Sequence, residues 1–553
     1  MRRSLVLLAP VWLLTGCPGW PPFQGCIGDC IASTGTTTGE AWSGTAIQTV
    51  TGDGDTGEVT DPGGMDGTGS VDGTGPTGSA SSTLDPVEVL PEILDIELPA
   101  EVHAAGPVPI TVLTKHAVTA RLRLDGVEIG ELAGAGKDVF VGEIVMKGAV
   151  DNGTHHVEVI ATRNEYEDSE DADFEVHAPA AGQPAWSKPG PPGSRANSVA
   201  LTFGGDVIEG GLRIGAGIPR PSVHVRAGFD GHDVWPKKVL VSELEGHVAD
   251  VAVAPDGGIW VAMNVKEIGQ KWRPHVVLLT PDGFATGVDE PGVVGHTLRA
   301  IAADDAGGAF AVGYAPAEGG DLDIVYQGVN AAHQGTVTNT WDYQPGNMQH
   351  MFADAAMAVV VEGDVAWVAG LSSGKHNAFD THTRGLLVPI DIHTGEVVGP
   401  VIIAPAVELW EHSMFFGAAV QPEGVVVTGA GCQDACGGVQ RLETSRYSPE
   451  GLRTWFQTEP PANGAHGSAV AVDSQGRAIV AGASKVGGVL RGQVFARKIG
   501  KAELAPVWSH LFPVSKEPSE ALAVTLDKYD RVFADGYVTV GGSPSTWLVQ
   551  LSP

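Results

Sequence analysis

The sequence predicts an all-β protein, and three observations support this class. One phrase, "SAVAVDSQGRAIVAG" at 468–482, returns in near copies about every fifty residues through the second part of the chain. Before these copies, about ninety residues alternate short apolar strands with turns. Glycine accounts for 76 of the 553 residues, which suits many tight turns. A chain of this length exceeds one ordinary core, so we expect more than one domain.

The N-terminus has the pattern of an export signal. Arg2 and Arg3 precede an apolar run over 5–14, which is too short to span a bilayer. The run ends in Leu-Thr-Gly-Cys, which resembles the bacterial lipobox. That resemblance implies a signal peptide over 1–16 and a lipid on Cys17 that anchors the chain in the membrane. An ordinary signal peptide followed by an incidental cysteine is the alternative.

Four further cysteines form two close pairs, Cys26 with Cys30 and Cys432 with Cys436. An exported protein resides in an oxidising compartment, so local disulfides are the first interpretation. A zinc site would need C-x2-C spacing or nearby histidines, which these pairs lack. We therefore predict two disulfides and no metal at these cysteines.

Residues 17–84 are expected to form a flexible linker. Positions 33–83 contain 13 Gly, 13 Thr and seven acidic residues, without Lys or Arg. Such a segment buries too little apolar surface to offset its chain entropy. The whole chain carries a net charge of −33, from 66 acidic and 33 basic residues. This charge disfavours nucleic acid as a partner.

The sequence of residues 85–178 predicts a β-sandwich. "PVPITVLT" and "THHVEVIATR" are two strands, and "ARLRLDGVEIGEL" is a hairpin that turns at Asp125-Gly126. "LDGVEIGEL" followed by "DNGTHHVEVIATR" resembles bacterial immunoglobulin-like modules, which implies a spacer or adhesive unit. The acidic run 164–175 is either a cation site or a solvated loop and edge strand, and we favour the second interpretation.

The repeats occupy residues 184–553. Each copy is a strand of small apolar residues, an Asp/Gly turn and a second strand that ends at a glycine in most copies. Those final residues lie 50 to 59 positions apart, a period typical of radial or linear repeat folds. The copies are 198–210, 248–263, 298–313, 355–370, 415–429, 468–482 and 520–536.

A second hairpin usually follows each copy, so one repeat supplies four antiparallel strands, the content of a propeller blade. The fourth strand often carries a tryptophan, and these are Trp186, Trp235, Trp341, Trp455 and Trp508. The last repeat ends at its third strand. We therefore predict that 183–188 pairs with 546–552 and closes a seven-bladed β-propeller, since closure removes open sheet edges.

The "VAVDSQGRAIVAG" pattern resembles the seven-bladed β-propeller repeat proteins found among bacterial surface lipoproteins. This resemblance covers about 184–553 and rests on the repeat pattern, not on catalytic residues. "IDIHTGEVV" at 390–398 also resembles the D-x-x-TG phrase of quinoprotein-type propellers. Because it occurs clearly only once, we expect no cofactor.

Five histidines lie just before the first strand of a repeat, and they are His247, His296, His350, His412 and His466. A ring would gather them on one face near the axis. They form either a metal or anion site at the channel mouth or a repeated structural hydrogen bond, and we favour the structural role.

Two other patterns are interpreted as structural. Gly370 to Gly374 matches G-x-S-x-G, but a nucleophile elbow needs a helix after its strand, and none is predicted here. Aspartates in the turns between first and second strands are expected to act as turn residues. They are Asp256, Asp304, Asp305, Asp473 and Asp527.

The sequence thus predicts a non-catalytic binding protein of the bacterial cell envelope, anchored by the lipid on Cys17 in the outer membrane or at the cell surface. Its partner would be a protein or a polysaccharide that binds the propeller face. Two alternatives stay open: an enzyme that acts on glycans or polymers, and a scaffold for envelope assembly.

Overall fold

The computed structural model describes residues 89–553 apart from 216, 236–238, 268, 318–321, 331, 333, 344–351, 375–381, 406–411, 433–439, 459–463, 501–504 and 514–515. The predicted signal peptide, Cys17, the linker and the Cys26–Cys30 pair lie outside the described residues. The chain divides into two units, Met1–Glu88 and Val89–Pro553. Within the described segments, no helix has the length and apolar character needed to cross a membrane.

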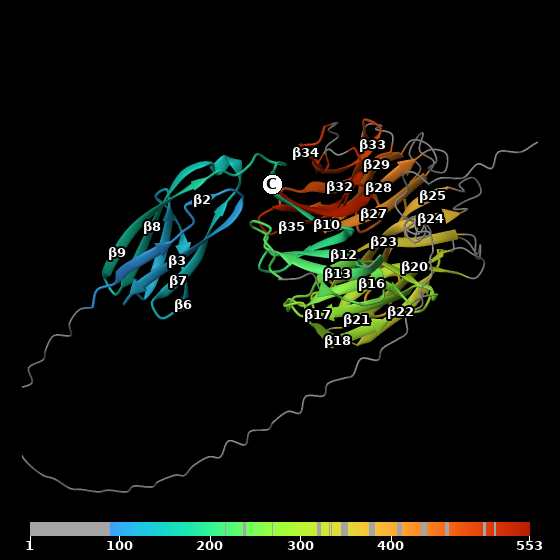
Figure 1. Cartoon of the computed structure of the whole chain (residues 1–553), viewed down its shortest axis with the longest axis horizontal. Coiled ribbons are helices and arrows are strands. Elements are labelled where there is room, and N and C mark those ends of the chain that lie inside the picture. Colours follow the sequence, from blue (N-terminus) through green and yellow to red (C-terminus); the bar gives the residue numbers. More distant parts are fainter. Residues whose placement is uncertain are drawn as a thin grey trace, which may run out of the picture. The chain divides into compact units, whose positions relative to one another are not determined.

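The described chain is all-β, as its sequence predicts. It contains 37 strands in nine small sheets, together with one 3-10 turn, η1 (Ala149–Asp151). Figure 1 labels many of these strands. The first nine strands build two of the sheets, and the remaining strands build the other seven.

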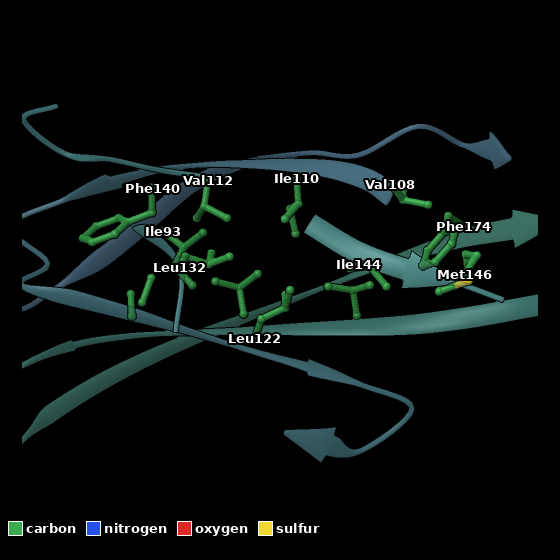
Figure 2. Close-up of a cluster of buried hydrophobic side chains, with 14 of the residues drawn as sticks. Ile93, Val108, Ile110, Val112, Leu122, Leu132, Phe140, Ile144, Met146 and Phe174 are labelled. Atoms are coloured by element: carbon green, nitrogen blue, oxygen red, sulfur yellow. The ribbon is translucent and has the colours of Figure 1, made fainter. Parts of the chain in front are cut away.

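The first two sheets enclose one apolar core. The four-stranded sheet contains β1 (Glu92–Glu97), β3 (Gly106–Lys115), β7 (Val139–Met146) and β6 (Ala133–Gly136). The five-stranded sheet contains β2 (Glu101–Val102), β9 (Tyr166–Val176), β8 (Gly153–Arg163), β4 (Thr119–Leu124) and β5 (Val127–Glu131). Ile110 and Ile144 of one sheet meet Phe174 of the other in this core (Figure 2). The arrangement is a β-sandwich.

Two details of the sandwich follow from its sequence. Asp125 and Gly126 both have positive φ, 50° and 80°, which a two-residue hairpin turn of this kind requires. The acidic run belongs mainly to β9, which pairs with β8 along its whole length but with β2 only at Glu175 and Val176. Most of the run therefore lies at a sheet edge, as predicted.

Residues 184–553 form seven four-stranded sheets in the described part of the chain. Four of them have consecutive strands that begin at β11 (Ser194–Leu201), β15 (Glu245–Val253), β19 (Thr297–Ala303) and β23 (Phe352–Glu362). Their other strands are β12 (Val207–Gly215), β13 (Ile218–Arg226), β14 (Val239–Leu240), β16 (Ile259–Lys266), β17 (Arg273–Leu279), β18 (Ala285–Pro291), β20 (Ala309–Pro316), β21 (Leu322–Val329), β22 (Gly335–Trp341), β24 (Val365–Gly374), β25 (Thr383–Asp391) and β26 (Ile402–Ile403).

The next two sheets begin at β27 (His412–Gln421) and β31 (His466–Val472). They continue with β28 (Gly424–Cys432), β29 (Gln440–Tyr447) and β30 (Arg453–Thr458), and with β32 (Arg477–Val486), β33 (Val489–Lys498) and β34 (Trp508–Leu511). The seventh sheet joins both ends of the region, in the order β10 (Pro184–Pro192), β37 (Ser543–Leu551), β36 (Val532–Val540) and β35 (Ser519–Leu526).

The seven sheets close into a cycle. Each first strand contacts the first strand of the next sheet, from β11 through β15, β19, β23, β27 and β31 to β35, and β35 contacts β11. The predicted closing pair is confirmed, because Trp186 of β10 faces Gln550 of β37 in an antiparallel register. Figure 1 shows green β10 among the red C-terminal strands. Closure leaves no first strand without a neighbour.

A β-bulge occurs at the same place in all seven first strands. One residue of each first strand is skipped in its register with the second strand. These seven bulge residues are Asn197, Ala249, Arg299, Met357, Phe416, Ser468 and Leu522. A bulge adds local twist and turns the strand, so the first strands all bend at one level of the cycle.

The bulges explain the glycine that ends most sequence copies. In six sheets the residue opposite the start of the bulge is a glycine, and a Cβ there would overlap a backbone carbonyl oxygen of the first strand. These glycines are Gly211, Gly313, Gly370, Gly429, Gly482 and Gly536. The sheet of β15 has Met263 at this place. Five of these glycines are the final residues of the copies identified in the sequence. The first copy ends at Gly210, one residue before Gly211.

Neighbouring sheets also meet through aromatic side chains and turn glycines. Trp235 packs on Gly283 in the turn between β17 and β18, and its indole N–H donates to the carbonyl of Pro281 at 3.2 Å. Tyr326 packs on Gly395 in the same way, with its hydroxyl 2.7 Å from the Gly395 carbonyl. Both glycines have positive φ, so the turn and the close aromatic contact need the same residue type.

We expect Gly429→Ala and Gly482→Ala each to lower the free energy of unfolding by about 1–3 kcal/mol or more. The new methyl group would meet the backbone, which cannot move aside as a side chain can. Gly215→Ala is the control, since a Cβ at this position meets nothing within 4 Å. Urea denaturation of the three variants tests this. Equal stabilities would show that the bulge accepts a side chain.

Candidate functional site

The residues two positions before the bulges occupy equivalent places in the seven first strands. They are Arg195, His247, Thr297, Ala355, Met414, His466 and Glu520. Four of them carry ionisable side chains, and these four come from consecutive sheets around the cycle. We call His466, Glu520, Arg195 and His247 the charged arc. The other three positions carry a hydroxyl or an apolar side chain.

A short hydrogen-bonded pair begins the arc. The His466 Nε2 lies 2.6 Å from the Glu520 Oε1, and both side chains are buried. The Tyr537 hydroxyl, on the strand beside Glu520, donates to the other carboxylate oxygen at 3.2 Å. Burial alone would raise the pKa of Glu520, but the His466 hydrogen bond and the charge on Arg195 lower it. Glu520 is therefore an ionised group inside the ring at neutral pH.

Arg195 is the next member of the arc. Its guanidinium carbon lies 4.9 Å from the centroid of the Tyr537 ring, a cation–π contact. The side chain is half-buried, and its Nε is buried without a hydrogen-bond partner among the described residues. Arg195 thus acts electrostatically on Glu520, and its charge lowers the pKa of that carboxyl.

His247 completes the arc beside a second arginine. Burial lowers the pKa of His247 to about 3, and the charges on Arg299 and Arg195 act in the same direction. Asn264, which faces His247 across the strand pair, has its amide nitrogen 3.4 Å from the His247 Nε2 and also binds the backbone of Leu298. His247 is therefore neutral at physiological pH, and the positive charge here belongs to the two arginines.

Arg299 is the bulge residue of β19 and is half-buried. Burial lowers the pKa of Arg299, and the positive charge of Arg195 lowers it further. The two guanidinium groups are therefore close enough to repel each other.

The axial space also contains a cavity of about 450 Å³ at the far ends of five first strands, lined mainly by aliphatic residues. Its lining includes Ala303, Val361, Val420, Val472 and Leu526, which lie toward the C-terminal ends of those strands. The charged arc lies toward the N-terminal ends. The two ends of the axial space thus differ in chemistry, with ionisable groups at one and aliphatic groups at the other.

Asp250 links three first strands below the arc. Its carboxylate accepts the Ser198 hydroxyl at 2.5 Å and the backbone N–H groups of Val251 and Ile301, each at 2.9 Å. Burial raises the pKa of Asp250 to about 6 in spite of these bonds. All its contacts serve the joint between neighbouring sheets, so we assign Asp250 a structural role.

The predicted histidines separate into two groups. His247 and His466 occupy arc positions, whereas His296 lies one residue before Thr297 and His412 two residues before Met414. His412 accepts the backbone N–H of Thr383 at 3.1 Å through its Nδ1. His350 lies outside the described residues. Among the described residues, no three His, Cys, Asp or Glu side chains are arranged to hold a metal ion.

The remaining sequence predictions concern structural residues. Ser372 is buried within β24, two residues before its C-terminal end, so it lies on a strand and not on a nucleophile elbow. The Asp304, Asp473 and Asp527 carboxylates accept backbone N–H groups of their own turns, which confirms them as turn residues. Cys432 is buried at the end of β28, and Cys436 lies outside the described residues, so their disulfide stays a prediction.

Two buried carboxylic acids with strongly raised pKa values are among those that the sequence did not reveal. Burial raises the pKa of Asp354 to about 7, and the charges of Asp342 and Asp323 raise it further. Burial also raises the pKa of Glu443 to about 7, although three nearby arginines oppose the shift. Neither residue belongs to a repeated motif. The only available signal was an acidic residue inside a stretch whose sequence predicts a strand.

A second cavity, of about 260 Å³, lies between the sheets of β19 and β23. Asp304 and Asn330 line it, and both already accept backbone N–H groups within their turns. His393 also lines it and lies 3.2 Å from Asp364. The polar groups that line this cavity are thus already engaged in hydrogen bonds within their turns. The charged arc is therefore the better candidate site.

No model of a known protein family matches the chain, and no curated protein does. The chain has weak similarity to several solved structures. Sqt1 from Chaetomium thermophilum is 12% identical, with 62% of this chain and 80% of that chain covered and a TM-score of 0.36. The phage phi92 endosialidase is 9% identical, with 69% and 70% covered and a TM-score of 0.38. These values are too low to transfer a function.

The free energy of unfolding should fall as the pH rises from about 4 to about 7. Asp250, Asp354 and Glu443 have raised pKa values in the folded chain, so they stay protonated where the unfolded chain has already released its protons. Each group contributes a slope of about 1.4 kcal/mol per pH unit within its own window. His247, whose pKa is lowered to about 3, contributes a slope of opposite sign up to about pH 6.5, so the net fall is smaller than the sum of the three. Urea denaturation at several pH values measures the slope.

Asp354→Asn should remove one group's share of that slope between about pH 4 and about pH 7. Asp282→Asn is the matched control, because Asp282 is exposed and its replacement should leave the slope unchanged. If the Asp354→Asn variant and the parent protein had the same pH dependence, Asp354 would ionise normally in the folded state.

Proposed function

We propose that this chain is a lipid-anchored protein of the bacterial cell envelope whose closed ring of sheets is a seven-bladed β-propeller that binds a ligand at its axial end. The sandwich that precedes it would be an immunoglobulin-like spacer. The lipid on Cys17 would hold the protein at the outer membrane or the cell surface, and the linker would extend the folded part from the bilayer.

The observation that carries the binding role is the charged arc. Consecutive sheets place His466, Glu520 and Arg195 at equivalent positions, where three other sheets carry Thr297, Ala355 and Met414. Buried ionisable groups are costly to desolvate. Their concentration at one end of the axial space therefore favours a functional surface over a purely structural one, and the rigid ring fixes their geometry.

A second candidate function is an enzyme that acts on a glycan or another polymer. The observation that favours it is the raised pKa of Asp354 and of Glu443, each about 7, which is suitable for a general acid. A scaffold role in envelope assembly is a third candidate and implies a stable membrane-protein partner.

A cross-linked pull-down of the lipidated protein from its native envelope tests the binding role. We expect a specific protein or polysaccharide partner, and Arg195→Gln together with Arg299→Gln should lower its recovery at least several-fold. Arg446→Gln is the control, because Arg446 lies on the third strand β29 and pairs with Val426, whose partner Ala419 lies five positions beyond Met414. Cys17→Ala should shift the protein from the membrane fraction to the soluble fraction.

Equal recovery from the double variant and the control would exclude the arc as the binding surface. Hydrolysis of envelope glycans that is lost in Asp354→Asn or Glu443→Gln, with folding retained, would favour the enzyme instead. A membrane fraction unaffected by Cys17→Ala would remove the lipid anchor from the proposal.

A further inference from the structure

We propose that the cycle of sheets carries a docking surface for a basic segment of another protein, and that Phe203, Phe229 and Phe284 form its apolar centre. The surface lies at the end of the cycle opposite the charged arc, so it goes beyond the ligand proposed for the arc and does not depend on it. The exposure of the three side chains, the contacts that join their turns and the charge beside them each support one part of the proposal.

The three phenylalanines lie in turns of two neighbouring sheets. Phe203 is in the turn between β11 and β12, Phe229 is in the segment between β13 and β14, and Phe284 is in the turn between β17 and β18. In a sheet of consecutive antiparallel strands, the turns after the first and the third strand lie at the same end. The first strands finish at this end, whereas the charged arc lies near their start.

Exposed aromatic side chains are rare in this chain. Phe203 and Phe284 are each 71% exposed and Phe229 is 62% exposed, and no other Phe, Tyr or Trp whose burial the structure describes is exposed. Apolar residues that are scattered singly over a surface need no explanation. Three exposed aromatic side chains on adjoining turns instead indicate an interaction surface.

The turns of Phe203 and Phe229 are in contact. A Cβ on Gly228 would overlap the carbonyl oxygen of Gly205, so the backbones of the two turns touch. Each of these glycines is within two residues of one of the exposed phenylalanines. The two side chains therefore belong to one surface of the first sheet.

The segment of Phe229 also contacts the turn of Phe284 on the next sheet. Trp235 packs on Gly283, and its indole N–H donates to the carbonyl of Pro281 at 3.2 Å. Val234, next to this tryptophan, is 41% exposed and adds to the apolar area. The surface thus continues from the first sheet to the second.

Hydrogen bonds within the turns hold two of the three side chains in place. The Thr202 hydroxyl oxygen accepts the backbone N–H of Asp206 at 3.0 Å, and the Thr280 hydroxyl oxygen accepts the backbone N–H of Phe284 at 3.1 Å. A surface that is ordered before it binds loses little conformational entropy on association. The exposed side chains are thus presented on formed turns.

Carboxylates flank the exposed side chains. Asp230 directly follows Phe229, and Asp282 lies two residues before Phe284, and both aspartates are exposed. A guanidinium or ammonium group can lie over the face of a phenyl ring and also reach a carboxylate beside it. Each of these two turns therefore offers both features that a basic side chain needs.

The overall charge of the turns favours a protein segment over a membrane. Residues 202–206, 227–235 and 280–284 contain four Asp and no Lys or Arg. Lys188 lies beside Gly231 and offsets part of this charge. Membrane surfaces attract clusters of Lys and Arg, which these turns lack. A segment that carries both basic and apolar side chains complements them, and aromatic residues and Arg are enriched at protein interfaces.

Peptide titration of the full mature chain tests the proposal, with Cys17→Ala so that no detergent is present. The probes are three blocked pentapeptides: Arg-Phe-Arg-Phe-Arg, Arg-Ser-Arg-Ser-Arg and Glu-Phe-Glu-Phe-Glu. The salt concentration is kept at about 0.15 M to screen long-range attraction to the acidic chain. We expect the first peptide to bind about tenfold more tightly than either of the others, because it alone supplies both the charge and the apolar side chains.

Variants of the surface should weaken the binding of Arg-Phe-Arg-Phe-Arg. The triple variant Phe203→Ser, Phe229→Ser and Phe284→Ser should lower the affinity about tenfold or more. Asp230→Asn together with Asp282→Asn should lower it several-fold, because the carboxylates that pair with the basic side chains are lost.

Leu452→Ser is the matched control and should leave the affinity unchanged, because Leu452 is 67% exposed in the turn between β29 and β30 of a different sheet. Melting temperature shows whether the triple variant folds, and Phe284→Ser alone replaces it if it does not. Equal binding of Arg-Ser-Arg-Ser-Arg, or full affinity in the folded serine variant, would overturn the proposal. Co-sedimentation with phosphatidylcholine vesicles that the serine variant loses would also overturn it, since the surface would then be a membrane contact.

Discussion

The structure of the repeat region depends on one steric constraint, the contact between the bulge of each first strand and the backbone opposite it. Six of the seven sheets meet this constraint with a glycine whose missing Cβ makes room for a carbonyl oxygen. The bulge bends each first strand at the same level, and the first strands then contact one another in a cycle. The small residues at the axis follow from that crowding: the Gly417 position, for instance, lies against the backbone of Ala469.

The same constraint positions the candidate site. Because the bulges are equivalent, the residues two positions before them form a layer around the axis, and any charged residue there acquires charged neighbours from adjacent sheets. Glu520 and Arg195 are such a pair, and the ionisable His466 and His247 flank them on the adjacent sheets. Their interactions connect neighbouring sheets. His466 and Glu520 share a hydrogen bond, and the charge on Arg195 lowers the pKa values of Glu520 and His247. The scaffold is repetitive, whereas the site arises where the repeats differ.

Much of the scaffold was accessible to sequence reasoning because its determinants are local and recur. The strand-ending glycines, the turn aspartates and the tryptophans of outer strands each repeat with the period of the sheets. Pairing of Trp186 with the C-terminal strand followed from counting strands. The histidines show the limit of this reasoning. Their distance from the final glycine varies by a few residues, and that variation moves His296 and His412 away from the arc.

The sequence by itself determined the all-β class, the period of the repeats, the turns and the strand that closes the cycle, because hydrophobic alternation and turn chemistry act between near neighbours in the chain. Only the tertiary structure decided which charged residues meet. Arg195 and Glu520 are separated by most of the repeat region, yet the charge on Arg195 lowers the pKa of Glu520 and also that of Arg299 on β19. Electrostatic partnership depends on distance in space, and a closed ring brings the first and last sheets together.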